Sequence, residues 1–245
     1  MSRHLIWWSA GAASTIAAKL YKELYTPENA DVQLIYCDPG SEHPDNERFR
    51  RDVESWLGVD IRVLKSTEYV DTWDVFNRTR FLVGQGGARC TVELKKKMRQ
   101  QYEDPDDIQV FGYTAEEQGR VDRFKRANPD VRLATPLIDH GVTKAECLGA
   151  LQSANIELPV MYTLGFQNAN CIGCPHGSMG YWNMIRKHFP DVFDRMAVLE
   201  RELDNAVCRP GGKPVFLDEL DPERGDIRTE PNIECGVLCR DEGES

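Results

Sequence analysis

The chain has 245 residues, a formal net charge of −10 at pH 7, eight cysteines and ordinary hydrophobic (41%) and charged (29%) fractions. This length is enough for one well-buried core and short for two full domains. No apolar run approaches the roughly 20 residues that span a bilayer, and the run before Ser9 is too short for a signal peptide. We expect a cytoplasmic protein with no membrane partner. Its charge favours a small anionic substrate over duplex DNA.

The first third of the chain alternates predicted strands and helices. Apolar runs predict strands over 5–8, 32–36 and 60–64, and apolar spacing predicts helices over 15–21 and 46–57. Such alternation is typical of a parallel sheet with helices on both faces, whose ligands bind at the carboxyl ends of the strands. We therefore predict an α/β, Rossmann-like fold.

The middle of the chain continues this pattern less regularly. Residues 72–99 predict mixed helix and loop, and 108–112 predict a further strand. Residues 133–138 predict an edge strand, because Pro136 cannot donate a hydrogen bond to a neighbouring strand. Thr143-Lys-Ala-Glu146 has the pattern of a capping box, which predicts the start of a helix.

The last third contains helices followed by an arm. Residues 177–203 predict helix with a break at Pro190, and the Pro-, Gly- and acid-rich segment after Cys208 predicts an extended, poorly packed arm. We expect a nucleotide-binding α/β domain over 1–204 that includes the Cys-x-x-Cys segment. The arm with its cysteine-containing tail would occupy 205–245.

A Ser-Ala-Gly-Ala-Ala-Ser turn joins the first strand to the first helix. Its backbone N–H groups and the hydroxyls of Ser9 and Ser14 can meet a phosphate at the positive end of the helix, and Gly11 allows a close approach. Small residues also suit a strand-to-helix turn that binds nothing. The turn alone leaves both interpretations open.

Three elements in order make the pattern more specific. They are the Ser-x-Gly-x-x-Ser turn, an Asp-x-Gly…Pro segment after the second strand and a later Gly-x-x-x-x-Glu element. The chain thereby resembles the phosphoadenosine phosphosulfate (PAPS) reductase family of the adenine-nucleotide α-hydrolase superfamily, over roughly residues 4–190. The residues that match are Ser9, Gly11, Ser14, Asp38, Gly40, Pro44, Gly112, Glu116, Glu117 and Arg120.

This resemblance implies an adenine-nucleotide site. Ser9, Gly11 and Ser14 would hold phosphate or sulfate. The segment with Asp38 and Gly40 would lie near the adenosine. The site would also include Glu116, and Arg120 would neutralise anionic charge, since arginine matches phosphate oxygens in bidentate geometry.

The turn departs from related ATP pyrophosphatases in one respect. Those enzymes carry Lys-Asp within it for phosphate and magnesium, whereas this chain has Ala12 and Ala13. The difference favours PAPS or adenylyl sulfate over ATP as the nucleotide.

The cysteines indicate a second site. Cys171-x-x-Cys174 has a spacing at which two thiolates bind one metal, either zinc or an iron–sulfur cluster. Cys90 follows a glycine loop and precedes basic residues that can stabilise its thiolate. The family resemblance implies a [4Fe-4S] cluster on Cys90, Cys171 and Cys174. Arg89 replaces the family's tandem cysteine, so the fourth ligand would be Cys239, Cys235, another group or the substrate.

The tail Glu234-Cys235-Gly236 resembles the Glu-Cys-Gly-Leu-His ending of the same family, with Val237-Leu238-Cys239 in place of Leu-His. The resemblance implies that Cys235 attacks the sulfonate sulfur and becomes S-sulfocysteine. A thioredoxin-like reductant would then release sulfite.

Two alternatives use the same residues differently. Cys171, Cys174, Cys235 and Cys239 also form a Cys-x2-Cys…Cys-x3-Cys set that is typical of structural zinc, which would make the chain a non-catalytic nucleotide-binding protein. The other alternative is an ATP-dependent sulfurtransferase that modifies a nucleobase, with a nucleic-acid acceptor. The remaining cysteines are expected to be buried apolar side chains, namely Cys37, Cys147 and Cys208.

Overall fold

The computed structural model describes residues 3–25, 30–84, 86–231 and 233, and its chain divides into two compact units. The sheet unit comprises Met1–Asp38, Pro44–Lys65 and Lys97–Pro159. The helical unit comprises Pro39–His43, Ser66–Lys96 and Val160–Ser245. This division differs from the expected boundary at residue 204, because three separate stretches of chain build each unit.

Five parallel strands form the sheet in the order β3-β2-β1-β6-β7. Their bounds are Arg3–Trp8 (β1), Asp31–Cys37 (β2), Ile61–Leu64 (β3), Ile108–Phe111 (β6) and Arg132–Ala134 (β7). The central strand β1 is apolar and buried, as expected for a strand covered on both faces. It pairs Trp8 with Tyr36 on one side and Trp7 with Phe111 on the other.

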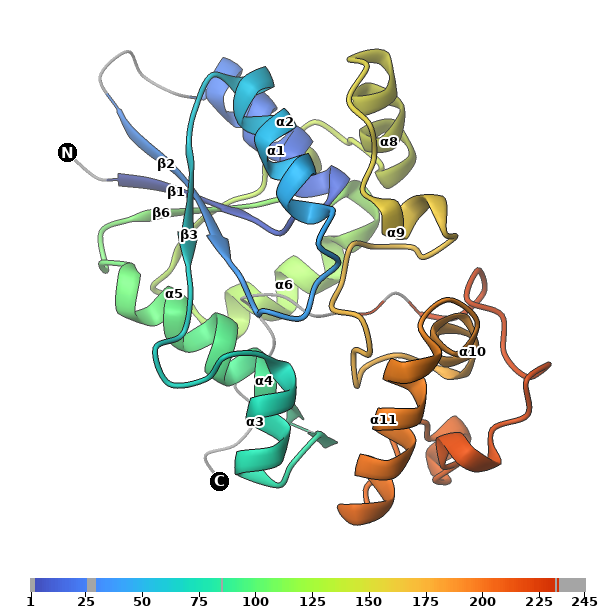
Figure 1. The fold of residues 1–245 in the computed structure, drawn as a ribbon. Coiled ribbons are helices and arrows are strands. Elements are labelled where there is room, and N and C mark those ends of the chain that lie inside the picture. Colours follow the sequence, from blue (N-terminus) through green and yellow to red (C-terminus); the bar gives the residue numbers. More distant parts are fainter. Residues whose placement is uncertain (1–2, 26–29, 85, 232, 234–245) are drawn as a thin grey trace. The chain divides into compact units, whose positions relative to one another are not determined.

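Helices cover both faces of this sheet. In Figure 1, α1, α2 and α8 lie on one side of it, and α5 and α6 lie on the other. The helices of the unit are Ala12–Leu24 (α1), Asn46–Leu57 (α2), Lys97–Tyr102 (α5), Gln118–Ala127 (α6), Pro136–Asp139 (α7) and Lys144–Ser153 (α8). The strand order reverses between β1 and β6, and in such sheets ligands bind at this switch point, beyond the strands' carboxyl ends. The predicted α/β fold is confirmed.

Two local predictions have different outcomes. The edge strand β7 ends at Ala134, and Pro136 begins the short helix α7. The strand expected over 133–138 is therefore confirmed for residues 133–134 and wrong for residues 136–138. Proline suits the first position of a helix because its missing N–H would have no helical partner there. The capping box is confirmed: Thr143 Oγ1 accepts from the Glu146 N–H at 3.2 Å, and the Glu146 carboxylate accepts from the Thr143 N–H at 2.8 Å.

The helical unit packs around one large apolar cluster that includes the fully buried Trp182. Its elements are Thr72–Thr79 (α3), Val83–Gly84 (β4), Gly87–Ala88 (β5), Arg89–Thr91 (α4), a π-helix over Val92–Lys96, Val160–Thr163 (α9), Met179–His188 (α10) and Pro190–Glu202 (α11). The expected break at Pro190 is confirmed, since α11 begins there. The antiparallel β4–β5 hairpin was not expected.

The arm, here residues 205–231 and 233, is better packed than its composition predicted. Leu217 and Leu220 are buried in the core of the helical unit. Arg186 of α10 donates hydrogen bonds to the carbonyl oxygens of these two leucines, at 3.1 and 2.8 Å. A composition rich in Pro, Gly and acids hides such packing, because the bonds use the arm's backbone rather than its side chains. None of the described helices has the length and apolarity that crossing a membrane requires.

Candidate functional site

The turn after β1 brings the two predicted serines together. The Ser9 N–H and hydroxyl both donate to Ser14 Oγ, at 3.1 and 3.2 Å, and Ser14 Oγ donates to the Gly11 carbonyl at 3.0 Å. Ala10 has a φ of 55°, a left-handed conformation that reverses the chain between strand and helix. Ser9, Gly11 and Ser14 therefore share one small, ordered loop at the switch point of the sheet.

Gly112 fits the end of β6 against the start of α1. A Cβ at this position would come within 2.6 Å of Ser14 Cα and 2.8 Å of Ser14 N, closer than real contacts allow. Only glycine permits this approach, so the Gly112 of the family pattern has a packing reason here. The contact places the loops after β1 and β6 on either side of the switch point.

The first turn of α1 favours an anion. It consists of Ala12, Ala13, Ser14 and Thr15, with no acidic residue, and its N-cap residue, Gly11, has no side chain that could cap it. A helix amino terminus carries about half a positive elementary charge and projects N–H groups toward a ligand. Small side chains leave room for phosphate or sulfate to reach this backbone.

Asp38 follows β2, the strand beside β1, and so lies at the same edge of the sheet. Its carboxylate pairs with Lys65 at 2.9 Å, and its N–H donates to the Leu64 carbonyl at 2.9 Å. Lys65 follows β3 and was not singled out from the sequence. The sequence shows only that Asp38 and Lys65 each follow a strand. It contains no other indication that the two side chains pair.

Glu116 and Arg120 follow β6 and have partners within the protein. Glu116 accepts from the Lys144 N–H at 3.2 Å, at the start of α8. Burial alone would raise its pKa, but hydrogen bonds from backbone N–H groups and Thr114 outweigh burial and lower it. Arg120 donates to Glu117 at 2.9 Å and lies 4.9 Å from the centre of the Tyr113 ring. A role of Glu116 and Arg120 in nucleotide binding stays a prediction.

In the helical unit, Gly40 supports the loop beside the Cys-x-x-Cys segment. Its φ is 70°, and a Cβ there would lie 2.4 Å from the Val70 carbonyl oxygen, so glycine is required. The next residue, Ser41, accepts from the Ile172 N–H through its carbonyl at 2.8 Å. Its hydroxyl oxygen accepts from the Thr72 hydroxyl, also at 2.8 Å. Gly40 thus shapes the surroundings of the cysteines, whatever its part in nucleotide binding.

The Cys171–Cys174 loop is fixed by one buried hydroxyl. Tyr181 Oη accepts from the N–H groups of Gly173 and Cys174, at 3.0 and 2.9 Å, and donates to the Cys171 carbonyl at 2.9 Å. Complete burial raises the pKa of Tyr181 well above its ordinary value, so this hydroxyl keeps its proton. Sequence spacing placed Tyr181 on a helix but gave no sign of this role.

The described cysteines are all buried, and Cys90 and Cys174 belong to the same apolar cluster. Thiolates are the ligands that zinc and iron–sulfur clusters prefer. Within the described residues, however, no three or more His, Cys, Asp or Glu side chains lie close enough to hold a metal ion. Cys235 and Cys239 lie outside the described residues. Cys37, Cys147 and Cys208 are buried, as expected for apolar side chains.

A π-helix follows α4, the short helix that contains Cys90, and carries buried charges. Lys95 pairs with Glu42 at 3.4 Å, and Glu93 pairs with Arg89 at 2.6 Å. π-helices are rare and frequently occur at functional sites, because their wider turn redirects side chains. Lys95, one of the basic residues after Cys90, is therefore held in an ion pair with an acid, a feature that the sequence order did not reveal.

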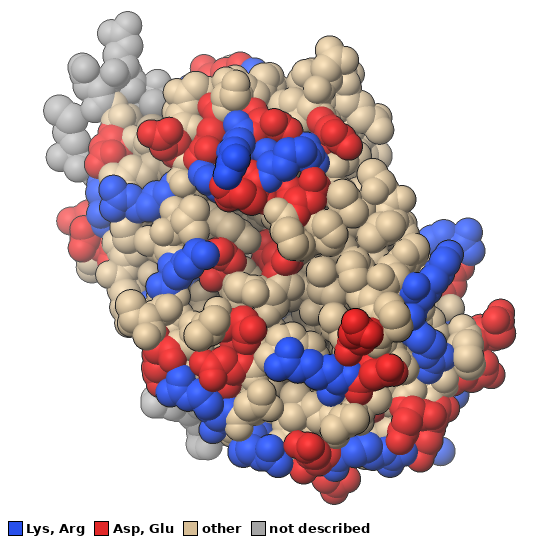
Figure 2. Space-filling model, in the orientation of Figure 1, with Lys and Arg blue, Asp and Glu red and all other residues tan. Residues whose placement is uncertain are grey.

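Charges are mixed on the face of the molecule shown in Figure 2. Figure 2 shows Lys and Arg side chains interspersed with Asp and Glu on the face drawn, including the residues over α2. There Arg48 pairs with Asp45 and Asp52, and Arg50 pairs with Glu47 and Glu54. Basic groups neutralised in this way add little attraction for a nucleic-acid backbone.

No protein-family model matches the sequence, and neither does any curated protein. Among solved structures, the chain is similar to the U34-tRNA thiolase NcsA from Methanococcus maripaludis with its [4Fe-4S] cluster, at a TM-score of 0.50 and 15% identity. That match covers 99% of this chain and 82% of the thiolase. A PAPS reductase from Candida auris, in complex with phosphate, matches at a TM-score of 0.48 and 10% identity, over 70% of this chain and 82% of the reductase.

At sequence identities this low, the matches show similarity of fold and nothing more. The thiolase match spans nearly the whole chain, and the sheet is parallel, as expected from the sequence. The chain therefore shares the fold of this thiolase, a parallel sheet with helices on both faces.

Proposed function

We propose that the chain is an enzyme that binds an adenylyl sulfonucleotide, PAPS or adenylyl sulfate, and transfers its sulfur group to a cysteine thiolate. The observation that carries this proposal is the first turn of α1 at the switch point. It is a helix start built of small residues, and its own side chains include neither a carboxylate nor a lysine. On binding, the Ser9 and Ser14 hydroxyls would exchange their bonds within the loop for bonds to the anion. This chemistry suits a phosphosulfate that is bound without magnesium.

The ion pair next to the turn also favours a sulfonucleotide over Mg-ATP as the ligand. Magnesium is held in proteins mainly by carboxylates. Asp38 lies at this edge of the sheet, but its carboxylate is engaged by Lys65 at 2.9 Å. A site for Mg-ATP would need a carboxylate that is available to the metal, whereas a sulfonucleotide needs only donors of hydrogen bonds.

Cys235 is the proposed nucleophile. Its thiolate attacks the sulfonate sulfur, and the bond from sulfur to the bridging phosphate oxygen breaks. The nucleotide leaves as adenosine 3′,5′-bisphosphate or AMP, and Cys235 becomes S-sulfocysteine. One thiol of a thioredoxin-like reductant then attacks Cys235 Sγ and expels sulfite. Its second thiol resolves the mixed disulfide and restores Cys235, so that the reductant ends as a disulfide.

A [4Fe-4S] cluster is part of this proposal, with Cys90, Cys171 and Cys174 as ligands and Cys239 as the fourth. The two thiols of the Cys171–Cys174 loop are presented by a backbone that Tyr181 holds fixed, which supports a metal ligand pair. A bound cluster would supply redox-active iron that attracts sulfur ligands. Zinc on Cys171, Cys174, Cys235 and Cys239 would supply only a structural tie.

A second candidate is an ATP-dependent sulfurtransferase that acts on a nucleobase. The observation that favours it is the structural similarity to NcsA, a tRNA thiolase. This similarity extends over 99% of the chain. Such an enzyme would adenylate its nucleic-acid acceptor and release pyrophosphate. The net charge of −10 and the alanines of the turn weigh against it.

The experiment compares PAPS, adenylyl sulfate and ATP, each with and without magnesium, in binding and in turnover with thioredoxin. We expect PAPS or adenylyl sulfate to bind without magnesium and to yield sulfite. Cys235→Ser should bind the same nucleotide and release no sulfite, and full turnover in this variant would remove the nucleophile. Pyrophosphate release with a tRNA acceptor would instead establish the second candidate. Stoichiometric zinc with no turnover of any nucleotide would indicate the non-catalytic protein.

A further inference from the structure

Asp38 and Lys65 lie side by side at the carboxyl edge of the sheet, and both belong to the sheet unit. The parallel register of β2 and β3 pairs Cys37 with Leu64, the residues just before them. The Asp38 N–H continues the ladder by donating to the Leu64 carbonyl at 2.9 Å. The two side chains then form an ion pair at 2.9 Å. The ends of β2 and β3 therefore present one acid and one base in direct contact.

The ion pair is open to solvent on the side of the lysine. The Lys65 side chain is 69% exposed, whereas that of Asp38 is 21% exposed. Exposed ion pairs contribute little to the stability of a fold, because water screens the attraction and holding a long side chain costs entropy. Stability is thus a weak reason for a lysine at this position. Its ammonium group is accessible to a ligand that lies over the edge of the sheet.

The order of the strands sets the direction in which a nucleotide would lie. β1, β2 and β3 are successive neighbours in the sheet (Figure 1). Neighbouring strands are about 4.8 Å apart, so the ends of β1 and β3 are separated by about 10 Å. An anion at the Ser9–Ser14 turn after β1 would place an attached ribose over the end of β2. The outer substituents of that ribose would then lie beside the end of β3.

Asp38 and Lys65 have the chemistry that such a ribose needs. In nucleotide-binding sheets of this kind, an acid after the second strand accepts from a ribose hydroxyl, and a nearby cation accommodates a phosphate on the ribose. A carboxylate alone would repel that phosphate. Because the Asp38 carboxylate is neutralised by Lys65, the pair can meet a hydroxyl with its acid and a phosphate with its base.

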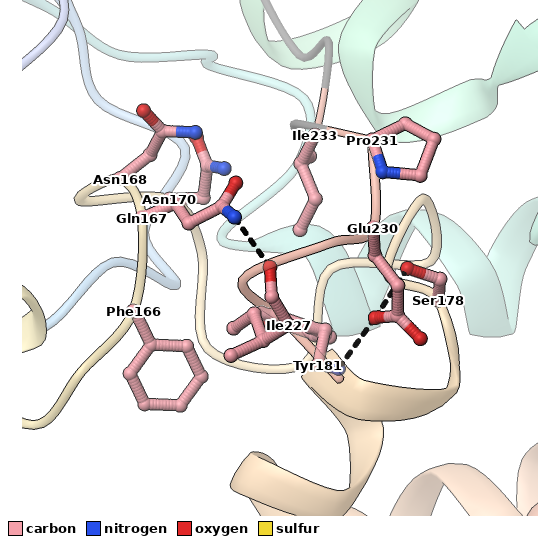
Figure 3. Close-up of a pocket in the computed structure, with 10 residues that line it drawn as sticks. All are labelled: Phe166, Gln167, Asn168, Asn170, Ser178, Tyr181, Ile227, Glu230, Pro231 and Ile233. Carbon is pink, nitrogen blue, oxygen red and sulfur yellow. Dashed lines mark hydrogen bonds between the residues drawn. The ribbon is translucent and has the colours of Figure 1, made fainter. Parts of the chain in front are cut away.

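The pocket of the helical unit has the opposite character. Figure 3 shows this pocket, of about 300 Å³, and among the ten described residues that line it the one charged side chain is that of Glu230. Its carboxylate accepts from the Ser178 hydroxyl and from the Gly180 N–H, both at 2.8 Å. A negative charge in this place repels phosphate. The edge of the sheet, rather than this pocket, suits a second phosphate of the nucleotide.

We propose that Lys65 is the residue that selects PAPS over adenylyl sulfate, by binding the 3′-phosphate that distinguishes the two nucleotides, while Asp38 accepts from the 2′-hydroxyl of the same ribose. The inference rests on the proposed function, because it takes the turn after β1 as the site of the phosphosulfate. It extends that function by naming the substrate and the side chain that recognises it.

The test measures the affinity of the full-length protein for adenosine 3′,5′-bisphosphate and for AMP by titration calorimetry, with no reductant and no turnover. These two nucleotides differ only in the 3′-phosphate. The wild type should prefer the bisphosphate by about tenfold or more, as one charge-assisted hydrogen bond provides. Lys65→Met should lose most of this preference and keep its affinity for AMP within about twofold of the wild type. Lys65→Arg, which keeps the cation, should retain most of the preference.

Two further variants separate recognition from a structural role. Lys125→Met removes the same charge from an exposed position in the last turn of α6, and it should match the wild type with both nucleotides. Asp38→Asn breaks the ion pair but leaves Lys65 in place. It should bind the bisphosphate at least as tightly as the wild type, because Lys65 then has the phosphate as its one anionic partner. A pair that served only the fold would be equally damaged by the loss of either member.

The outcomes distinguish this inference from the proposed function. Equal affinities of the wild type for the two nucleotides, or a preference that Lys65→Met retains, would overturn the role of Lys65 and leave the sulfonucleotide site intact. A loss of affinity for both nucleotides in Lys65→Met, together with a lower Tm, would also overturn it by showing a structural role. Binding of neither nucleotide to the wild type would overturn the proposed function and this inference with it.

Discussion

Gly112 leaves no room for a methyl group beside Ser14, since a Cβ on Gly112 would lie 2.6 Å from the Ser14 Cα atom. The atoms that it would strike belong to the backbone of α1 and cannot swing aside as a flexible side chain can. The fit between β6 and α1 therefore depends on the absence of one carbon atom.

Gly112→Ala should displace the first turn of α1 and weaken nucleotide binding. Overpacking of this kind costs about 1–3 kcal/mol of stability. We expect the loss of nucleotide affinity to exceed what partial unfolding explains, because the displaced N–H groups are those that would meet the anion. Thermal unfolding and nucleotide titration of the same sample check this.

Gly119→Ala provides the matched control for that variant. Gly119 lies in α6, where an added Cβ would meet only the end of the Arg123 side chain, at 4.0 Å. Alanine in a helix is more favourable than glycine by about 1 kcal/mol, so this variant should be as stable as the wild type or more so. Equal effects of the two substitutions on nucleotide binding would contradict the role given to Gly112.

Tyr181→Phe should loosen the Cys171–Cys174 loop. The change removes one hydroxyl and leaves two buried N–H groups and one buried carbonyl without it. Each unsatisfied buried group costs about 1–3 kcal/mol, and partial relaxation gives an expected loss of about 2–4 kcal/mol. Urea unfolding measures it, and Tyr69→Phe, at a partly exposed position, should cost much less.

The metal content of Tyr181→Phe gives an independent readout. If the loop presents its thiolates to a metal, iron or zinc per chain should fall in this variant under conditions where the protein is still folded. Unchanged metal content would mean that metal binding by Cys171 and Cys174 does not depend on the Tyr181 hydroxyl.

Glu200 predicts a pH dependence of stability. Its buried carboxylate accepts from the Val207 N–H at 3.0 Å and from the Leu217 N–H, and burial raises its pKa to about 7. The folded state then binds this proton more tightly than the unfolded state. The free energy of unfolding should therefore be highest below about pH 4.5, as far as this group is concerned, and fall as the pH rises to about 7, by at most about 3 kcal/mol.

Urea unfolding at pH 5, 6, 7 and 8 tests this dependence. Glu200→Gln cannot titrate, so its unfolding free energy should vary less over the same range. Glu202→Gln, at an exposed position of the same helix, should keep the slope of the wild type. A wild-type slope of the opposite sign, unchanged by Glu200→Gln, would show that the carboxylate stays charged when buried.

Much of the sheet unit could be predicted from the sequence because its signals are local. The helix expected over 46–57 has the bounds of α2, and Thr143 begins α8 through a bond to a residue only three positions away. Apolar runs identified each strand of the sheet, since a parallel strand that is covered on both faces needs apolar side chains throughout.

The helical unit was harder to predict because its order depends on distant contacts. Glu230 bonds to Ser178, and Arg186 bonds to Leu217, over separations of 52 and 31 residues. Neither pair follows a periodic pattern, and the arm's composition alone resembles that of a loop. Tyr181 was missed for the same reason. A tyrosine on a helix face predicts core packing, and nothing in its spacing shows that its hydroxyl holds a loop.

The chain crosses between the two units five times, after Asp38, His43, Lys65, Lys96 and Pro159. Pro39–His43 belongs to the helical unit although it joins β2 to α2 of the sheet unit. No single cut can therefore yield either unit as one continuous polypeptide. The unit that carries Cys90, Cys171 and Cys174 therefore cannot be expressed or deleted as one piece of chain without cutting through the sheet unit.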